Sequence, residues 1–281
     1  IRKITKSSKI NVGGACSGGI TTATFASLLA AADDKRINAL TFMVCVLDPK
    51  RDDSDLGQIV SDGSLEIARK YSKRKGILKG DDLARMFAWM RPNDLIWNYV
   101  VNNYLMGEDP PPYDVLFWNN DTTNLPAQLH SDFLDFGMTQ PFANPGQVDI
   151  AGHKADLTKV TCDSFVVAGL TDHITPWKAC YRTPSLLGSK NIEFVLSSSG
   201  HLQSLINPPG NPKAKYFASA EIKPTADEWA ATAEEHAGSW WPRWGAWLKE
   251  RSGALKVSPK SCGSEAFPPL YAAPGKYVFD E

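Results

Sequence analysis

Long apolar runs alternate with helical and turn-like segments over the first and last parts of this chain. Unbroken apolar runs cover residues 39–48, 164–170 and 191–196. Strands that are buried on both faces of a parallel sheet have this unalternating pattern. A shorter strand is predicted to end at residues 9–12, before a helix over residues 20–31 that is rich in small and apolar residues. The succession of strands and helices predicts βαβ units and a mainly parallel sheet.

The stretch over residues 51–151 lacks this strand pattern. Three helices are predicted in it, over residues 63–72, 81–90 and 95–105. Asp81 or Asp82 is the predicted N-cap of the second helix. A single crossover rarely needs so many residues, so we interpret the stretch as a mostly helical cap insertion over the strand ends. A set of ordinary crossover helices is the alternative. The predicted core then consists of residues 1–50 and 152–256.

The last part of the chain is rich in tryptophan and then in proline, glycine and serine. Five tryptophans occur within 24 residues: Trp229, Trp240, Trp241, Trp244 and Trp247. Trp240, Trp244 and Trp247 would share one helical face, which favours packing onto the core. A surface for a hydrophobic granule or a partner is the alternative interpretation. Residues 257–281 are predicted to be a loose tail.

Composition and charge exclude several classes of function for this chain. The chain has 281 residues, of which 43% are hydrophobic and 22% charged, with a net charge of −1, as in ordinary globular proteins. No block of like charge suggests nucleic acid as a partner, and no apolar run is long enough for a membrane span. The five cysteines are scattered without C-x-x-C spacing, which favours reduced thiols in a cytoplasm and argues against a zinc site.

A glycine-flanked cysteine follows the first predicted strand. Gly14, Cys16 and Gly18 have the spacing of the G-x-S-x-G nucleophile elbow, with cysteine in place of serine. The sharp turn is expected to strain the backbone of Cys16, and side chains at Gly14 and Gly18 would collide with neighbouring elements. At a helix N-terminus the backbone N–H groups favour the thiolate, so Cys16 is the predicted nucleophile. A buried structural cysteine is the alternative.

The ends of two later strands offer an acid and a base. Asp172 follows the run that ends at residue 170, and His201 follows the run that ends at residue 196. In a nucleophile-elbow fold the chain order is nucleophile, acid, base, each on a loop after a strand. The sequence therefore predicts that His201 acts as the base for Cys16 and that Asp172 orients it.

Other residues compete for these roles. Asp48 also ends a predicted strand and is the alternative acid, whereas His173 is expected to support the site without acting as base. Cys45 and Cys162 lie in or beside strands and are expected to pack in the core. Surface or local structural roles are expected for the three remaining histidines: His130 in the insertion, His153 in a polar turn and His236 in the terminal helix.

Five motifs together resemble the poly(3-hydroxyalkanoate) synthase family. They are GACSGG at 14–19, RPNDLIW at 91–97, FWNND at 117–121, DHITPW at 172–177 and GH at 200–201. The likeness runs over residues 9–256, and the elbow and residues 95–99 look more like the single-subunit, medium-chain-length class. The resemblance implies an α/β-hydrolase-type fold with a mainly parallel sheet and a cap over the active site. It also implies that Cys16, His201 and Asp172 are catalytic.

The family polymerises (R)-3-hydroxyacyl-CoA into storage polyester. The resemblance implies acyl transfer through a cysteine thioester, with the backbone N–H of Ser17 as one oxyanion donor. It further implies a CoA thioester as substrate with no cofactor and no metal, and a homodimer at the surface of a cytoplasmic polymer granule. A cysteine-nucleophile esterase or thioesterase is the rival enzyme, and a catalytically silent granule-binding protein is the rival from another class.

The family has a long region before the elbow. Almost none of that region is present before Cys16 in this sequence. N-terminal strands of the fold are therefore expected to be missing. The strand that carries Ile10 and Val12 is predicted to become a sheet edge. The chain on its own is expected to be inactive, because a second oxyanion donor should come from a loop after an earlier strand.

Overall fold

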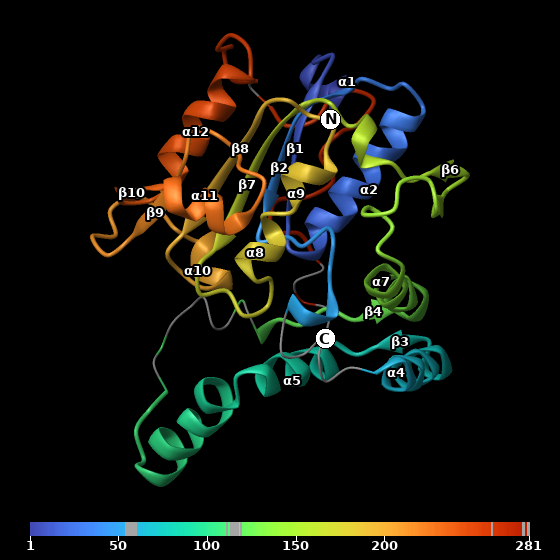
Figure 1. Cartoon of the computed structure of the whole chain (residues 1–281). Coiled ribbons are helices and arrows are strands. Elements are labelled where there is room, and N and C mark those ends of the chain that lie inside the picture. The colour runs from blue at the N-terminus through green and yellow to red at the C-terminus, as the bar shows by residue number, and fades with distance from the viewer. Residues whose placement is uncertain are drawn as a thin grey trace.

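The computed structural model describes residues 1–53, 61–110, 112, 118, 120–259, 261–276 and 279. Its centre is a six-stranded sheet with the strand order β1-β2-β7-β8-β9-β10 (Figure 1). The strands are β1 (Ile10–Ala15), β2 (Ile37–Met43), β7 (Asp163–Gly169), β8 (Ile192–Ser197), β9 (Lys215–Ala218) and β10 (Glu234–Ala237). The first four pair in parallel, whereas β9 and β10 pair antiparallel. The predicted mainly parallel α/β sheet is confirmed.

The sheet separates two hydrophobic layers. One layer lies against α2 (Ser17–Ala31) and the other against α12 (Trp241–Glu250). On β7, Val166 belongs to the first layer, while Phe165 and Val167 belong to the second. Because both faces of the central strands are covered, apolar residues occupy successive positions, which explains the unbroken runs in the sequence.

The tryptophans near the C-terminus pack in the core. Trp229 in α11 (Ala226–Thr232) is fully buried, and its ring meets Phe194 edge-on at 4.8 Å between centroids. Trp240 and Trp247 are buried in the layer under α12. The core interpretation of these side chains is confirmed for all three.

The structure differs from the sequence-based prediction at two places in this sheet. β2 ends at Met43, because Val44 has a positive φ of 44°, although its N–H still donates to Val167 O on the neighbouring strand β7 at 2.8 Å. Asp48 therefore lies five residues beyond the strand. The short antiparallel strands β9 and β10 were not predicted, because each has only four residues, too few to show a strand pattern. His236, which was expected in the terminal helix, lies in β10.

Residues 51–151, the predicted insertion, are mostly helical where the structure describes them. The elements here are α4 (Asp62–Lys75), β3 (Ile77–Leu78), α5 (Gly80–Met90), η2 (Asn93–Trp97), η3 (Val100–Leu105), β4 (Leu125–Pro126), α7 (Ala127–Thr139), β5 (Asp149–Ile150) and β6 (His153–Lys154). Most of these elements lie on the side of the sheet where the parallel strands end (Figure 1). Residues 54–60, 111, 113–117 and 119, with part of the FWNND motif, are outside the described residues.

One detail of the insertion was predicted wrongly. The N-cap of α5 is Lys79, which makes no side-chain capping bond, and Asp81 and Asp82 lie inside the first turn. The third predicted helix is present, and most of it is π-helical, in the segments η2 and η3.

The shorter elements connect this framework. They are α1 (Arg2–Thr5), η1 (Arg51–Asp53), η4 (Leu157–Lys159), α8 (Trp177–Cys180), α9 (Thr183–Leu186) and α10 (His201–Leu205). Past α12, the described part of the tail contains one isolated bridge, between Ser264 and Phe267. Most side chains in this part are exposed, as predicted for a loose tail. None of the helices in the described ranges has the length and apolar character needed to cross a membrane.

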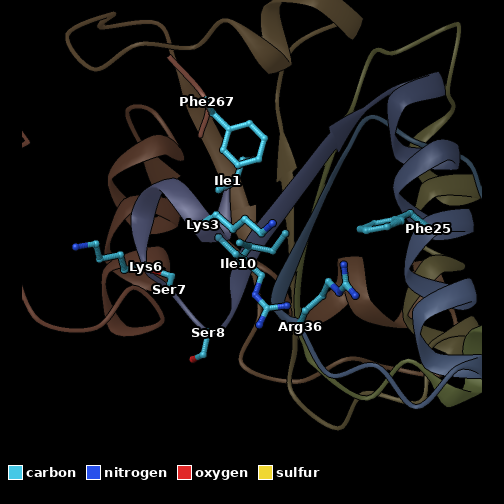
Figure 2. Close-up of a pocket in the computed structure, with 10 residues that line it drawn as sticks. Ile1, Lys3, Lys6, Ser7, Ser8, Ile10, Phe25, Arg36 and Phe267 are labelled. Atoms are coloured by element: carbon cyan, nitrogen blue, oxygen red, sulfur yellow. The ribbon is translucent and has the colours of Figure 1, made fainter. Parts of the chain in front are cut away.

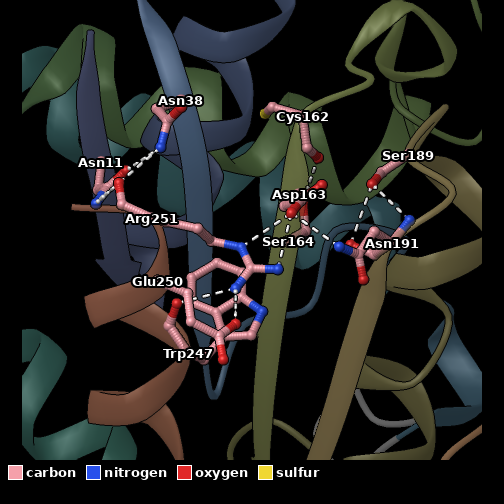
Figure 3. A network of polar contacts seen from close by, with 10 residues as sticks. All are labelled: Asn11, Asn38, Cys162, Asp163, Ser164, Ser189, Asn191, Trp247, Glu250 and Arg251. Atoms are coloured by element: carbon pink, nitrogen blue, oxygen red, sulfur yellow. Dashed lines mark hydrogen bonds and ion pairs between the residues drawn. The ribbon is translucent and has the colours of Figure 1, made fainter. Parts of the chain in front are cut away.

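A polar network fixes the amino ends of the parallel strands (Figure 3). Asn38 on β2 donates to Asn11 on β1 at 3.0 Å and to the carbonyl of Arg251 at 2.9 Å. The Arg251 guanidinium, which follows α12, pairs with Asp163 at the start of β7, and Asn191 donates to the same carboxylate at 2.8 Å. These bonds hold β1, β2, β7 and α12 in register at the end of the sheet opposite the elbow.

β1 forms one edge of the sheet, as predicted, and β2 is its only partner among the described strands. A cavity of about 740 Å³ lies beside this edge, lined by α1 residues, Ile10, Phe25, Arg36 and Phe267 (Figure 2). Ile10 begins β1 and Cys16 follows its end, so this cavity lies about 20 Å from the elbow at the rise of a strand. It is therefore separate from the candidate active site.

Candidate active site

Cys16 occupies a strained turn between β1 and α2. Its φ and ψ are 51° and −123°, which is a backbone conformation that residues with a Cβ rarely adopt. The Cys16 N–H donates to Met43 O on β2 at 2.9 Å, and its carbonyl accepts from Gly19 N at 2.9 Å. These bonds hold the thiol half-buried at the N-terminus of α2. The strain expected of a nucleophile elbow is confirmed.

The glycines around Cys16 do not share one role. A Cβ at Gly14 would overlap the carbonyl of Gly18 and the hydroxyl group of Thr22. A Cβ at Gly18 would meet nothing within 4 Å, so the expected collision at this position is wrong. Gly19, which the motif does not include, is the second crowded position, because a Cβ there would overlap the sulfur of Cys45.

We expect Gly14→Ala to destabilise the protein strongly and Gly18→Ala to be tolerated. The first methyl group would push against backbone, which cannot move without opening the turn, whereas the second would enter open space. We expect Gly14→Ala to lower the free energy of unfolding by about 2 kcal/mol or more, and Gly18→Ala to change it by less than about 1 kcal/mol. Denaturant titration of both variants measures this difference. Equal stability of the two would contradict the packing described for Gly14.

Asp172 and His201 follow the ends of the neighbouring strands β7 and β8. His201 Nδ1 lies 2.7 Å from Asp172 Oδ2, which is a strong charge-assisted geometry. The Asp172 side chain is fully buried, while that of His201 is 15% exposed. Because Nδ1 is engaged by the carboxylate, Nε2 is the ring nitrogen that remains for a partner on the elbow.

The loop after β7 wraps around the Asp172 carboxylate. Oδ1 accepts from the backbone N–H groups of Ile174 and Thr175, both at 2.9 Å, and Oδ2 accepts from the Thr175 hydroxyl at 2.7 Å. Burial alone would raise the pKa of Asp172, but the hydrogen bond and charge of His201 and the donors of Thr175 outweigh it. The pKa of Asp172 is therefore below its usual value, and the carboxylate is ionised at neutral pH.

The imidazole of His201 interacts with both Asp172 and Cys16. Burial alone would lower the pKa of His201, but hydrogen bonding to Asp172 and to Cys16, together with their negative charges, raises it to about 9. At neutral pH the ring is therefore an imidazolium that bridges the carboxylate and the sulfur. The structure thus brings together the three side chains that the sequence predicted, each from a different strand end.

Ser17 and His173 also lie at this site. Ser17 is the first residue of α2, where helix geometry leaves backbone N–H groups without intrahelical acceptors. His173 is partly buried, and its Nδ1 has no hydrogen-bond partner among the described residues. Burial lowers the pKa of His173, and the nearby positive charge of Arg91 lowers it further. Because Arg91 precedes η2, the cap approaches the acid loop at His173.

The competing acid is engaged elsewhere. Asp48 is buried, and its Oδ2 lies 3.2 Å from the Arg182 guanidinium, which also binds the carboxylate of Asp53. Gln140 Nε2 donates to the carbonyl of Pro49 at 2.6 Å, next to this cluster. Asp48 is thus paired with Arg182 in this structure.

The other histidines lie away from the elbow. His130 is buried between α4 and α7, with Nδ1 2.8 Å from Ser72 Oγ, which gives it a structural place in the cap. His153 is exposed in the turn of β5 and β6, and His236 stacks on Tyr216 at 4.9 Å between centroids. These contacts agree with the local roles expected for the three residues.

Three of the other cysteines are packing residues. Cys45 and Cys180 are buried and Cys162 is partly buried, and none forms a disulfide. Burial raises the pKa of Cys45 and Cys180, and it raises that of Cys162 to about 11, so all three are neutral thiols. Among the described residues no group of three or more histidine, cysteine and acidic side chains could hold a metal ion.

Two residues that organise the site were not predicted from the sequence. Thr175 lies in the DHITPW motif, three residues after the acid, where a hydroxyl group can reach back to an aspartate in a turn. That spacing was a usable signal. Arg182 had none, because its partners Asp48 and Asp53 are about 130 residues earlier in the chain.

Curated proteins similar to this chain are named as poly(3-hydroxyalkanoate) polymerases. Poly(3-hydroxyalkanoate) polymerase 1 of Ectopseudomonas oleovorans is 47% identical over 99% of this chain and 49% of its own length. The polymerase subunit PhaC of Cupriavidus necator is 37% identical over 99% of this chain and 48% of its own length. The chain spans about half the length of the curated relatives it matches. The resemblance drawn from the five motifs is confirmed.

A solved structure and a family model also match this chain. A solved hydrolase of Pseudomonas aeruginosa PA01 aligns with a TM-score of 0.43 and 13% identity over 73% of this chain and 62% of that chain, which is too distant to add to the fold described above. A family model for the alpha/beta hydrolase fold matches residues 1–208, which include the elbow, the acid and the base. The chain therefore belongs to the α/β-hydrolase fold family.

Proposed function

We propose that this chain carries the catalytic centre of an acyltransferase that polymerises (R)-3-hydroxyacyl-CoA into polyester with release of CoA. The observation that carries the proposal is the pairing of His201 with Asp172 at 2.7 Å and with Cys16 at the elbow. The names of the curated relatives supply the substrate class and the product.

The first step is a thioester exchange. His201 holds the proton of the Cys16 thiol in a thiolate–imidazolium pair, and the thiolate attacks the carbonyl carbon of the acyl-CoA. The backbone N–H of Ser17 donates to the oxyanion. The carbon–sulfur bond to CoA then breaks, and the CoA thiolate takes the proton from the imidazolium. One thioester is made and one is broken, which suits a cysteine better than a serine.

The second step forms the ester bond. The 3-hydroxyl group of a hydroxyacyl unit attacks a thioester carbonyl, and His201 accepts its proton as the thiolate leaves. Asp172 stays ionised and stabilises the imidazolium formed in both steps. His173 lies beside the acid and supports the loop without taking the proton, because burial and Arg91 disfavour its charged form.

Cap and core have distinct roles in this proposal. Residues 51–151 limit water at the strand ends, and residues 1–50 and 152–256 supply the catalytic groups. No cofactor or metal takes part. The protein acts in the cytoplasm as a homodimer at the granule surface, and it prefers medium-length acyl chains.

The decisive experiment compares polymer with free acid. The full-length protein is incubated with 3-hydroxybutyryl-CoA and with 3-hydroxydecanoyl-CoA, and CoA, polymer and free hydroxy acid are measured. The proposal predicts polymer from both substrates at unequal rates, with the faster rate from the decanoyl substrate. Release of free acid alone would instead establish a thioesterase. If no CoA is released and Cys16 does not react with iodoacetamide, the protein is instead a catalytically silent binding protein.

A further inference from the structure

Every lone-pair direction of the Asp172 carboxylate that faces the protein is used. Three of its four hydrogen bonds come from residues 174 and 175, and the fourth comes from His201. The Thr175 hydroxyl and the imidazole bind the same oxygen, Oδ2, each at 2.7 Å. Thr175 Oγ1 also lies 3.2 Å from His201 Nδ1, so the three groups form a closed triangle.

We propose that Thr175 is a positioning residue whose hydroxyl group shares Oδ2 of Asp172 with His201 and thereby sets how strongly the carboxylate holds the imidazole. Its importance for turnover rests on the proposed function, whereas its effect on His201 rests on the geometry alone. The hydroxyl donates to Oδ2 and draws negative charge from it. The imidazole is thus held in one orientation, but Oδ2 attracts it less strongly than it would if it made no second hydrogen bond.

Burial makes this hydroxyl group hard to replace. The side chain of Asp172 is 0% exposed, and Thr175 is 8% exposed. Water therefore has little access to Oδ2 if the hydroxyl is removed, and the oxygen is left with the imidazole alone. Removal of the hydroxyl group should consequently change the pKa of His201 measurably in solution.

The backbone around Thr175 is fixed independently of its hydroxyl. The Thr175 N–H donates to Oδ1 of Asp172, and the Thr175 carbonyl accepts from the Cys180 thiol at 3.5 Å. Both bonds survive in Thr175→Val, which keeps the branched shape and replaces only the hydroxyl with a methyl group. The variant therefore removes one interaction at the triad and leaves the loop in place.

The chain provides a matched control. Thr183 in α9 is fully buried, and its hydroxyl group has no hydrogen-bond partner among the described residues. Thr183→Val makes the same chemical change as Thr175→Val away from Asp172. Thr175→Ser restores the hydroxyl group, and Thr175→Ala serves as a second removal variant if valine disturbs the fold.

The measurement is the alkylation of Cys16 in the full-length protein by iodoacetate and by iodoacetamide across pH. The imidazolium of His201 attracts only the anionic reagent, so the ratio of the two rates falls as pH rises through the pKa of His201, which is about 9. The other titratable groups around the ring are Asp172, Cys16 and His173, and Arg91 and Asp94 face His173 from the cap.

We expect Thr175→Val to raise the midpoint of this ratio by about half a pH unit, because Oδ2 then acts on the imidazolium alone. CoA release should fall by roughly tenfold, since the ring is no longer held in one place. Thr175→Ser should restore both values, and Thr183→Val should change neither. An unchanged or lowered midpoint in a folded Thr175→Val protein would overturn the proposal. A raised midpoint in a protein that makes no polymer would leave it intact and reject the proposed function.

Discussion

Replacement of Cys16 by alanine should abolish CoA release and polymer formation in the full-length protein. The thiol is the group that would carry the acyl chain, and no other cysteine at the site can replace it. Cys45 and Cys180 are buried, with their pKa values raised by burial, and remain neutral thiols. We expect a loss of at least about 10³-fold, as when a nucleophile is removed from a catalytic triad.

The fold should survive this change. Cys16 is half-buried in a turn that is fixed by backbone bonds to Met43 and Gly19, so the side chain contributes little packing. We expect a loss of less than about 1 kcal/mol in unfolding free energy. Cys262→Ala, which changes an exposed cysteine, is the control and should retain full activity. CoA release from Cys16→Ala at the unmodified rate would rule out the thioester intermediate.

Asp172→Asn should lower CoA release by roughly 10²–10⁴-fold and leave a measurable residual rate. An amide in place of the carboxylate cannot hold the positive charge on His201, and its NH₂ group can turn toward Nδ1. The ring would then present the wrong tautomer to Cys16. Without the carboxylate, the pKa of His201 should fall from about 9 toward its ordinary value, because burial is no longer opposed.

The variant Asp48→Asn separates the two acids that the sequence left open. Asp48 pairs with Arg182 at the base of the cap and makes no contact with His201 among the described residues. We expect its substitution to affect stability more than the pH dependence of Cys16 alkylation. If Asp48→Asn, and not Asp172→Asn, lowered the midpoint of that profile, the assignment of the acid would be wrong.

Local patterns in the sequence determined the catalytic layout. The glycines around Cys16 predict a strained elbow, and its φ of 51° agrees with that expectation. Asp172 and His201 were predicted because each follows an apolar run, and parallel strands place their carboxyl ends at one edge of the sheet. Strand periodicity and turn chemistry act over a few residues, so the sequence alone contains these signals.

Only the tertiary structure decided how these parts meet. No local pattern indicates that Gly19 packs on Cys45, because this contact depends on a loop more than twenty residues later. Asp48 ends an apolar run and therefore had the position of a catalytic acid. The positive φ of Val44 ends β2 early, however, and Asp48 pairs with Arg182. β9 forms on the edge that β8 offers, and β10 in turn pairs with β9, although each strand has only four residues. Long-range pairing thus fixed the sheet order and the choice of acid, because each joins segments that are distant in the sequence.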